Sequence, residues 1–319
     1  MRRRTLLVLA LAAAPGWAQT PLPLGPPLLG YAYDPAAGSI LRLSGVPGAA
    51  LFDAAIPIEP RLAAVFVAGV EEHAIGLDAG RQPLLLGWGD GRLSIRELPY
   101  GPVDAAAVFS ASGGTVVLYT GAGGPMQVWT GLPGEPRLAA IRPTGFDGSL
   151  TAIAVSEDGR VAIGLTIGGQ SSVLLLGEGS GRVLATGGRF GALAFSPDGS
   201  ELLAADAGEN RVWVLQARAL NPSPRLVASA QDGVAEPVAV AWSREGTRRV
   251  VAGRDGAVLL VENSGAIRTV NCECRIDGLH RLRGDAVFRL VDPPKGRTPV
   301  FDAGADEPRV VFLPMEVER

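Results

Sequence analysis

The feature that most constrains the fold of this chain is a phrase that recurs along it. Each copy has an apolar strand ending in Ser, a Gly-containing turn, a second strand, and a third strand rich in Val and Leu. The clearest copy, GALAFSPDGSELLAADAGENRVWVL, spans residues 191–215, and related copies begin near residues 64, 106, 152, 238 and 279. An N-terminal segment from residue 29, LGYAYDPAAGSILRL, matches the second and third strands only. Self-similarity at a fixed period is typical of repeat architectures.

The spacing of the copies predicts the kind of repeat. Successive copies start roughly 40 to 46 residues apart, the length of one four-stranded blade of a β-propeller. Six copies and the partial one predict an all-β propeller of seven four-stranded blades over residues 28–314. A six-bladed ring and a β-sandwich array stay open as alternatives. Residues 61–77 come closest to a helical pattern, and we interpret them as two further strands.

The turns give the repeat a physical basis. In the Ser-Pro-Asp-Gly turn at residues 196–199, Pro197 pre-sets its own φ and Gly199 can adopt a positive φ. Each such turn should join the innermost strand of a blade to the next strand. The first blade has no evident innermost strand, so we expect ring closure to mix the two chain ends, with residues 309–313 as the last strand.

These turns, together with the strand-loop-strand phrase LLAADAGENRVWVL, resemble those of bacterial seven-bladed propellers of the YVTN and WD-repeat-like kind. The resemblance covers nearly all of residues 28–314. No blade has the Gly-His and Trp-Asp pair of true WD repeats. The resemblance implies an architecture and leaves the activity unspecified.

The N-terminus has the pattern of an export signal. Arg2, Arg3 and Arg4 precede a ten-residue apolar stretch, and small residues precede a cleavage site between Ala18 and Gln19. We therefore expect a signal peptide at residues 1–18, a Pro-rich lead at 19–27, the propeller at 28–314 and a short tail at 315–319. The mature protein should be periplasmic or secreted, with no membrane span after cleavage, and monomeric.

Charge and motifs narrow the classes of function. The formal net charge is −3 and no basic run follows the N-terminus, so we expect no nucleic-acid partner. We expect no cofactor, because the glycine-rich segments lack the Lys-Ser/Thr of a phosphate loop. His73, beside Glu71 and Glu72, is interpreted as a solvated turn residue. His280 lies on the entry strand of the last blade and could face the channel, but neither histidine has the sequence context of a catalytic triad.

Cys272 and Cys274 are the two cysteines of the chain. Outside the cytoplasm such a pair usually forms a disulfide, and we predict one here, with local effects because the loop that it closes is tiny. Free thiols, or a metal site completed by His280, stay open as alternatives. Two cysteines and one histidine fall short of a full tetrahedral set, so no metal is expected.

Charged residues recur just before the innermost strands. Ring symmetry would bring them to one mouth of the channel, where mixed charges could hold a protein or a small polar ligand. The sequence therefore predicts a binding or scaffold module without catalytic residues. The alternative is a hydrolase resembling propeller lactonases, with a metal held by convergent side chains in the channel. The candidate ligand-binding residues are Arg61, Asp104, Asp147, Arg189, Glu236, Asp277 and His280.

Overall fold

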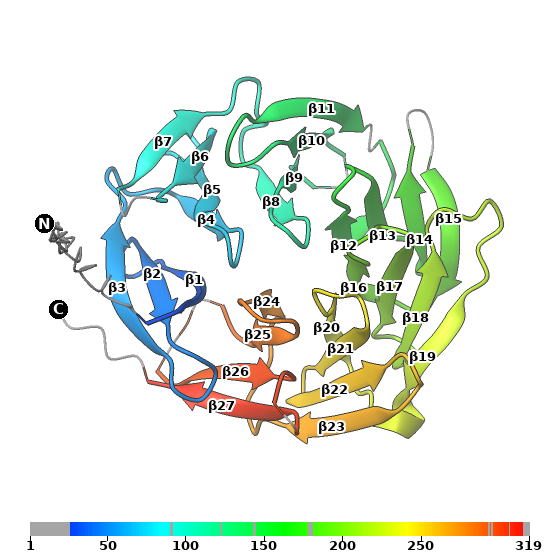
Figure 1. The fold of residues 1–319 in the computed structure, drawn as a ribbon. Coiled ribbons are helices and arrows are strands. Elements are labelled where there is room, and N and C mark those ends of the chain that lie inside the picture. The colour runs from blue at the N-terminus through cyan, green and yellow to red at the C-terminus, as the bar shows by residue number, and fades with distance from the viewer. Residues whose placement is uncertain are drawn as a thin grey trace, which may run out of the picture.

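The computed structural model describes residues 26–89, 92–121, 123–142, 145–177, 181–292, 294, 296–305 and 307–314. Over these ranges the chain is almost entirely β-strand, and its seven antiparallel sheets form the blades of a ring (Figure 1). The prediction of an all-β, seven-bladed propeller is confirmed. The expected signal peptide with its cleavage site, most of the Pro-rich lead and the tail lie outside the described residues.

The blades follow one another in chain order, and within the described residues blade 1 has three strands and the others four. Blade 1 is β1 (Leu28–Asp34), β2 (Ser39–Ser44) and β3 (Leu51–Pro57); blade 2 is β4 (Ala64–Val67), β5 (His73–Leu77), β6 (Pro83–Gly87) and β7 (Ser94–Glu97); blade 3 is β8 (Ala106–Phe109), β9 (Thr115–Tyr119), β10 (Met126–Thr130) and β11 (Arg137–Arg142); blade 4 is β12 (Ser149–Val155), β13 (Val161–Ile167), β14 (Gln170–Leu176) and β15 (Gly181–Gly187).

The second half of the ring repeats the pattern. Blade 5 is β16 (Phe190–Phe195), β17 (Glu201–Asp206), β18 (Arg211–Gln216) and β19 (Arg225–Ser229); blade 6 is β20 (Pro237–Trp242), β21 (Arg248–Gly253), β22 (Ala257–Glu262) and β23 (Ile267–Asn271); blade 7 is β24 (His280–Arg281), β25 (Val287–Arg289), β26 (Thr298–Asp302) and β27 (Arg309–Leu313). One short 3-10 helix, η1 (Ala230–Asp232), follows β19. Within the described ranges, no helix combines the length and apolarity needed to cross a membrane.

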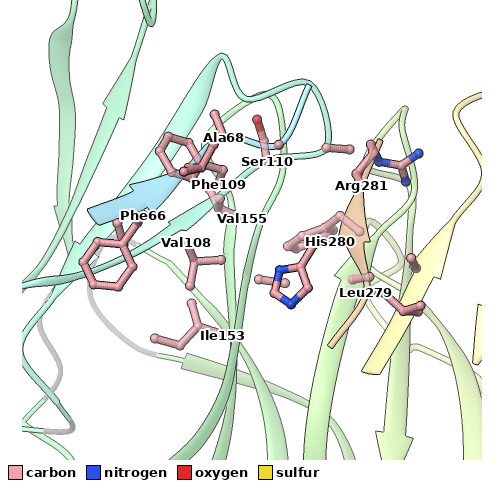
Figure 2. Close-up of a pocket in the computed structure, with 18 of the residues that line it drawn as sticks. Phe66, Ala68, Val108, Phe109, Ser110, Ile153, Val155, Leu279, His280 and Arg281 are labelled. Carbon is pink, nitrogen blue, oxygen red and sulfur yellow. The ribbon is translucent and has the colours of Figure 1, made fainter. Parts of the chain in front are cut away.

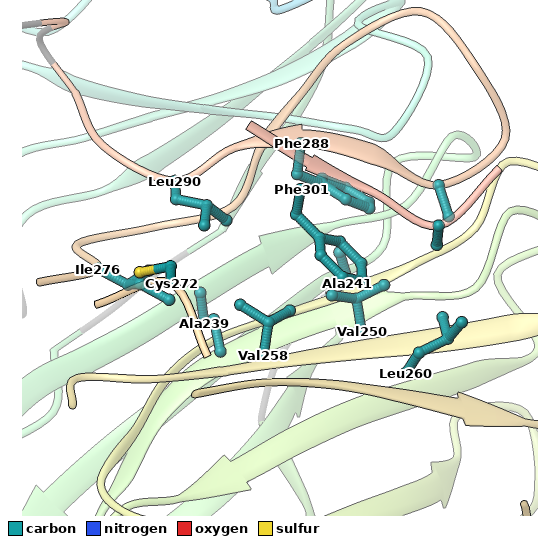
Figure 3. Close-up of a cluster of buried hydrophobic side chains, with 13 residues drawn as sticks. Ala239, Ala241, Val250, Val258, Leu260, Cys272, Ile276, Phe288, Leu290 and Phe301 are labelled. Carbon is teal, nitrogen blue, oxygen red and sulfur yellow. The ribbon is translucent and has the colours of Figure 1, made fainter. Parts of the chain in front are cut away.

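The hydrophobic core lies between the blades. A buried cluster joins each neighbouring pair around the ring, so every sheet is covered on both faces. Figure 3 shows the cluster between blades 6 and 7, where Val250 and Val258 pack against Phe288 and Phe301. Burial on both faces explains why the inner strands read as continuous apolar runs. A single blade could not bury both of its faces, so the ring is stabilised by stacking.

The turns that join the innermost strand of a blade to its second strand are here named the inner turns. In the inner turn of blade 5, the N–H of Gly199 donates to the Ser196 carbonyl at 2.8 Å, and Gly199 has a φ of 66°. Hydrogen bonds from the Ser196 hydroxyl and from Ser200 hold the pKa of Asp198 at about 2. The predicted turn chemistry is confirmed here. The inner turns of blades 2 to 7 are residues 68–72, 110–114, 156–160, 196–200, 243–247 and 282–286.

Ring closure differs from the expectation. The strand Arg309–Leu313 pairs with β26 and completes its own blade, so among the described residues no blade mixes the two chain ends. Blade 1 instead packs directly against blade 7 through a shared apolar cluster. The backbone of β1 is also bonded on both sides: Leu29 O accepts from Arg283 N at 2.7 Å, and Tyr31 N donates to Gly69 O at 3.1 Å. Among the described residues blade 1 has no strand inside β1, and the inner turns of blades 7 and 2 supply hydrogen-bond partners to β1 instead.

Candidate functional site

A cavity of about 470 Å³ occupies the centre of the ring. Its walls come from the innermost strands of blades 2 to 7, and Tyr31 of β1 contributes from blade 1. Among the described residues, each innermost strand pairs with a neighbouring strand on one side only, so its other edge presents backbone N–H and C=O groups to the channel. The volume lies in the range of small-molecule sites in proteins.

Most of the residues that line the cavity have apolar side chains. Phe66 and Phe109 stand on one side with Val108 and Ile153 (Figure 2), and Leu193 continues the surface in blade 5. These residues come from blades 2 to 5. They line the cavity with aliphatic and aromatic groups that favour an apolar occupant.

The side of the cavity formed by blade 7 is polar. His280 of β24 points its imidazole into the cavity toward Val108 and Ile153 (Figure 2). Its Nε2 atom lies 3.5 Å from Asp277 Oδ1. Burial opposes ionisation of Asp277, yet the contact with His280 and the N–H of Asp292 hold the pKa of this carboxyl below its ordinary value. Asp277 is therefore a carboxylate at neutral pH and holds one side of the imidazole.

The local backbone explains the position of His280. Gly278 lies against the imidazole, and a Cβ at this position would be 2.7 Å from Nε2. The N–H of Asp277 donates to the Leu290 carbonyl at 3.2 Å, and the Asp292 N–H donates to the Asp277 carboxylate at 3.1 Å. These hydrogen bonds join the segment before β24 to the residues that follow β25, and they fix the position of His280.

The other charged groups on the cavity wall already have partners. Arg289 donates to Asp292 Oδ1 at 2.7 Å. Arg281 donates to the carbonyl of Trp242, and its guanidinium lies 4.9 Å from the centre of the Phe288 ring. Burial lowers the pKa of Arg281 to about 10, so it stays charged at neutral pH.

Glu157, also on the cavity wall, is fixed by the neighbouring blade. Its carboxylate accepts from Ser110 Oγ at 2.8 Å, from Ser112 N at 2.7 Å and from Ser112 Oγ at 2.5 Å. The inner turn of blade 4 is thereby locked onto that of blade 3. Glu157 is not among the predicted site residues, because its partners are more than forty residues away in sequence.

The predicted ring of charges lies outside this cavity. Of the seven candidate ligand-binding residues, His280 lines the cavity and the other six are exposed elsewhere on the molecule. Asp277 is the one of these six that contacts His280. The prediction that the six form a ligand site at the channel mouth is untested and stays a prediction.

Four of the six charged side chains, and the backbone N–H of Arg189, contact the connections between second and third strands or the residues that flank these connections. Each contact joins the start of an innermost strand to its own or the preceding blade, which gives these residues a structural role. Asp147 is exposed. The contacts are Arg61 with the Pro35 carbonyl at 2.5 Å, Asp104 with Arg81, Arg189 N with Asp206 Oδ1 at 2.8 Å, Glu236 with Arg254 at 3.4 Å, and Asp277 with Asp292 N at 3.1 Å.

The interpretation of His73 as a solvated turn residue is wrong. His73 is the first residue of β5 and is 0% exposed. Its Nε2 lies 3.0 Å from the Gly113 carbonyl, and its ring meets Phe109 edge-on at 5.6 Å. The acidic neighbours Glu71 and Glu72 suggested a wet turn, but the strand begins directly after them and buries the histidine between blades 2 and 3.

Cys272 and Cys274 lie as a close pair with Cα atoms 5.1 Å apart. This separation is within the range that a disulfide requires, and Glu273 between them has a φ of 51°, which makes the tight turn. The disulfide itself stays a prediction. Among the described residues, no group of three His, Cys, Asp or Glu side chains converges as a metal site would require.

Comparison with known proteins supports the fold alone. No family model matches this chain, and no curated protein matches it. A functionally unknown protein from Desulfotomaculum acetoxidans DSM 771 superposes with a TM-score of 0.62 at 15% identity, over 90% of this chain and 99% of that chain. The fold is a seven-bladed β-propeller. The resemblance to YVTN and WD-repeat-like propellers stays a hypothesis.

Two further structures show the same likeness. KlHsv2 with loop 6CD replaced by a Gly-Ser linker has a TM-score of 0.53 at 12% identity, over 90% of this chain and 98% of that chain. A chain of the mitotic checkpoint complex has a TM-score of 0.51 at 15% identity, over 77% and 78%. At such identities a shared propeller fold carries no information about function.

Proposed function

We propose that this protein is a binding module and that its ligand is a small molecule held in the central cavity. The observation that supports the proposal is the cavity of about 470 Å³, lined mainly by residues with apolar side chains, with most of its charged groups supplied by blade 7. A pocket of this size, lined mainly by apolar residues together with placed polar groups, is the usual form of a small-molecule site. Export to the periplasm or the medium belongs to the proposal on the strength of the N-terminal sequence pattern.

The proposal can be tested with β-naphthol, a neutral probe small enough for the cavity. Isothermal titration calorimetry should detect binding to the unmodified protein. Val108 lines the cavity beside Ile153, so Val108→Trp should fill the space and weaken binding about tenfold or more, a loss of roughly 1.4 kcal/mol.

The matched control places the same substitution outside the cavity. Val183 lies on the outermost strand β15 of blade 4 and is 51% exposed, so Val183→Trp should leave the affinity unchanged. Circular dichroism should show the same β-content in all three proteins. Absence of binding to the unmodified protein, or equal affinity in all three, would contradict the proposal.

A further inference from the structure

On the basis of the proposed binding function, we infer that the cavity ligand is an uncharged molecule with an apolar body and a single O–H or N–H donor. His280 Nδ1 accepts the hydrogen bond of this donor, and Asp277 positions the imidazole. Three features of the cavity favour such a ligand: the pairing of the charges around it, the orientation of His280 and the composition of the opposite wall.

The pairing of the charges argues against a charged ligand. Arg289 is 3% exposed and bonded to Asp292 at 2.7 Å, and the carboxylate of Glu157 is occupied by Ser110 and Ser112. Arg281 is bonded to the Trp242 carbonyl and stacked on Phe288. A charge brought into the cavity would lose its hydration, and the charged groups of the wall are already bonded within the protein, so the burial of that charge is costly.

The contacts of His280 make it the acceptor. Nε2 is buried, lies 3.5 Å from the Asp277 carboxylate and makes no closer hydrogen bond. A carboxylate can only accept, so of the two neutral tautomers of the imidazole it selects the one with its proton on Nε2. The two nitrogens of an imidazole point in different directions, which leaves Nδ1 as an acceptor for the cavity. Gly278 keeps the ring in this place, since a Cβ there would lie 2.7 Å from Nε2.

The cavity wall opposite His280 suits the apolar body of the ligand. Val108, Ile153 and Phe66 face the imidazole across the cavity (Figure 2). A flat or compact apolar body placed against them would bury its surface at roughly 25 cal/mol per Å². The single donor would then decide its orientation, since a hydrogen bond adds direction to an otherwise non-directional contact.

Three probes that share a naphthalene body separate these contributions: β-naphthol, which can donate; its methyl ether, which cannot; and β-naphthoate, which is anionic. The unmodified protein should bind the naphthol about five- to tenfold more tightly than the ether, the difference expected for one net hydrogen bond. The naphthoate should bind more weakly than both.

Variants of His280 and Asp277 test whether Nδ1 of His280 accepts the hydrogen bond of the ligand. His280→Leu should remove the preference for naphthol over ether, whereas His280→Asn should keep part of it because the amide oxygen can accept near the place of Nδ1. Asp277→Asn should also shrink the preference, because an amide can donate to Nε2 and move the ring proton to Nδ1. A merely structural role of Asp277 would weaken both probes equally.

The outcomes distinguish this inference from the proposed function. If naphthol and ether bind the unmodified protein equally and Val108→Trp blocks both, the inference fails and the channel remains a binding site. If the naphthoate binds most tightly, the conclusion that the ligand is uncharged is wrong. If no probe binds, the inference and the proposed function both fail.

Discussion

Burial assigns different roles to the two histidines of the chain. His73 is completely enclosed, and burial lowers its pKa below the ordinary value of 6.5, although the contact with the Gly113 carbonyl opposes this effect. His280 stands in the cavity wall with one nitrogen near a carboxylate. The first histidine therefore contributes to stability and the second to the proposed site, a division that residue type alone does not predict.

The buried histidine makes stability depend on pH. In the unfolded chain His73 takes up a proton near its ordinary pKa of 6.5, whereas in the folded protein its pKa is lower. The unfolded state therefore binds more protons as the pH falls below about 6.5, and the free energy of unfolding should decrease. Urea unfolding at pH 7 and pH 5 should show a smaller loss for His73→Gln than for the unmodified protein. Equal losses would contradict the assignment.

At the scale of the element, the inner turns act as contacts between blades. Glu157 bonds the blade 3 turn through its carboxylate, and Asp285 of blade 7 accepts from Glu245 N of blade 6 at 2.9 Å. We expect Glu157→Ala to lower the free energy of unfolding by about 1–2 kcal/mol, because it leaves two serine groups without their acceptor.

Glu245→Ala is the matched control for this prediction. Glu245 enters its contact through the backbone N–H, which alanine retains, so the substitution should stay within about 0.5 kcal/mol. Urea titration followed by circular dichroism measures both variants. A Glu157→Ala variant as stable as the control would show that the inter-blade bond is energetically neutral.

The repeat was sufficient to predict the strands and their turns, since strand period, Gly and Pro are local signals. The repeat could not predict which residues of a neighbouring blade each turn contacts. Ser112 meets Glu157 at a separation of 45 residues, and only the packing of one blade on the next shows which side chain fills which gap. His73 was misplaced for the same reason: its neighbours in sequence are acidic, and its neighbours in space are Phe109 and Gly113.

At the scale of the whole molecule, the ring closes through β1, which has no inner strand beside it among the described residues. Gly30 is buried there, and a Cβ at this position would lie 2.6 Å from Leu282 Cδ2 of blade 7. Gly30→Val should force the two terminal blades apart and lower the free energy of unfolding by about 1–3 kcal/mol.

The control for ring closure is a glycine in open space. Gly145 has no heavy atom within 4 Å of a built Cβ, so Gly145→Val should be close to neutral. Hydrogen exchange should show faster exchange in β1 and β27 of Gly30→Val than in the strands of blades 3 to 5. Equal exchange in all blades of Gly30→Val would contradict ring closure through the contact of blade 1 with blade 7.

The cavity, like the contact between blades 1 and 7, forms only in the assembled ring. The repeat predicted charges at the starts of the innermost strands, and four of these six side chains bond within or between blades. The apolar wall comes from blades 2 to 5, whereas the paired Arg289 and Asp292 come from blade 7. Their convergence follows from blade order and tilt, which a linear pattern does not contain.

The most direct test of the central claim is a crystal structure of the protein soaked with a brominated β-naphthol, collected at the bromine absorption edge. The account predicts an anomalous peak inside the ring, between Val108 and Ile153 on one side and His280 on the other, with the hydroxyl turned toward Nδ1. A peak on the outer surface, or a cavity that holds only solvent while the same solution shows binding by calorimetry, would contradict the claim that the central channel is the binding site.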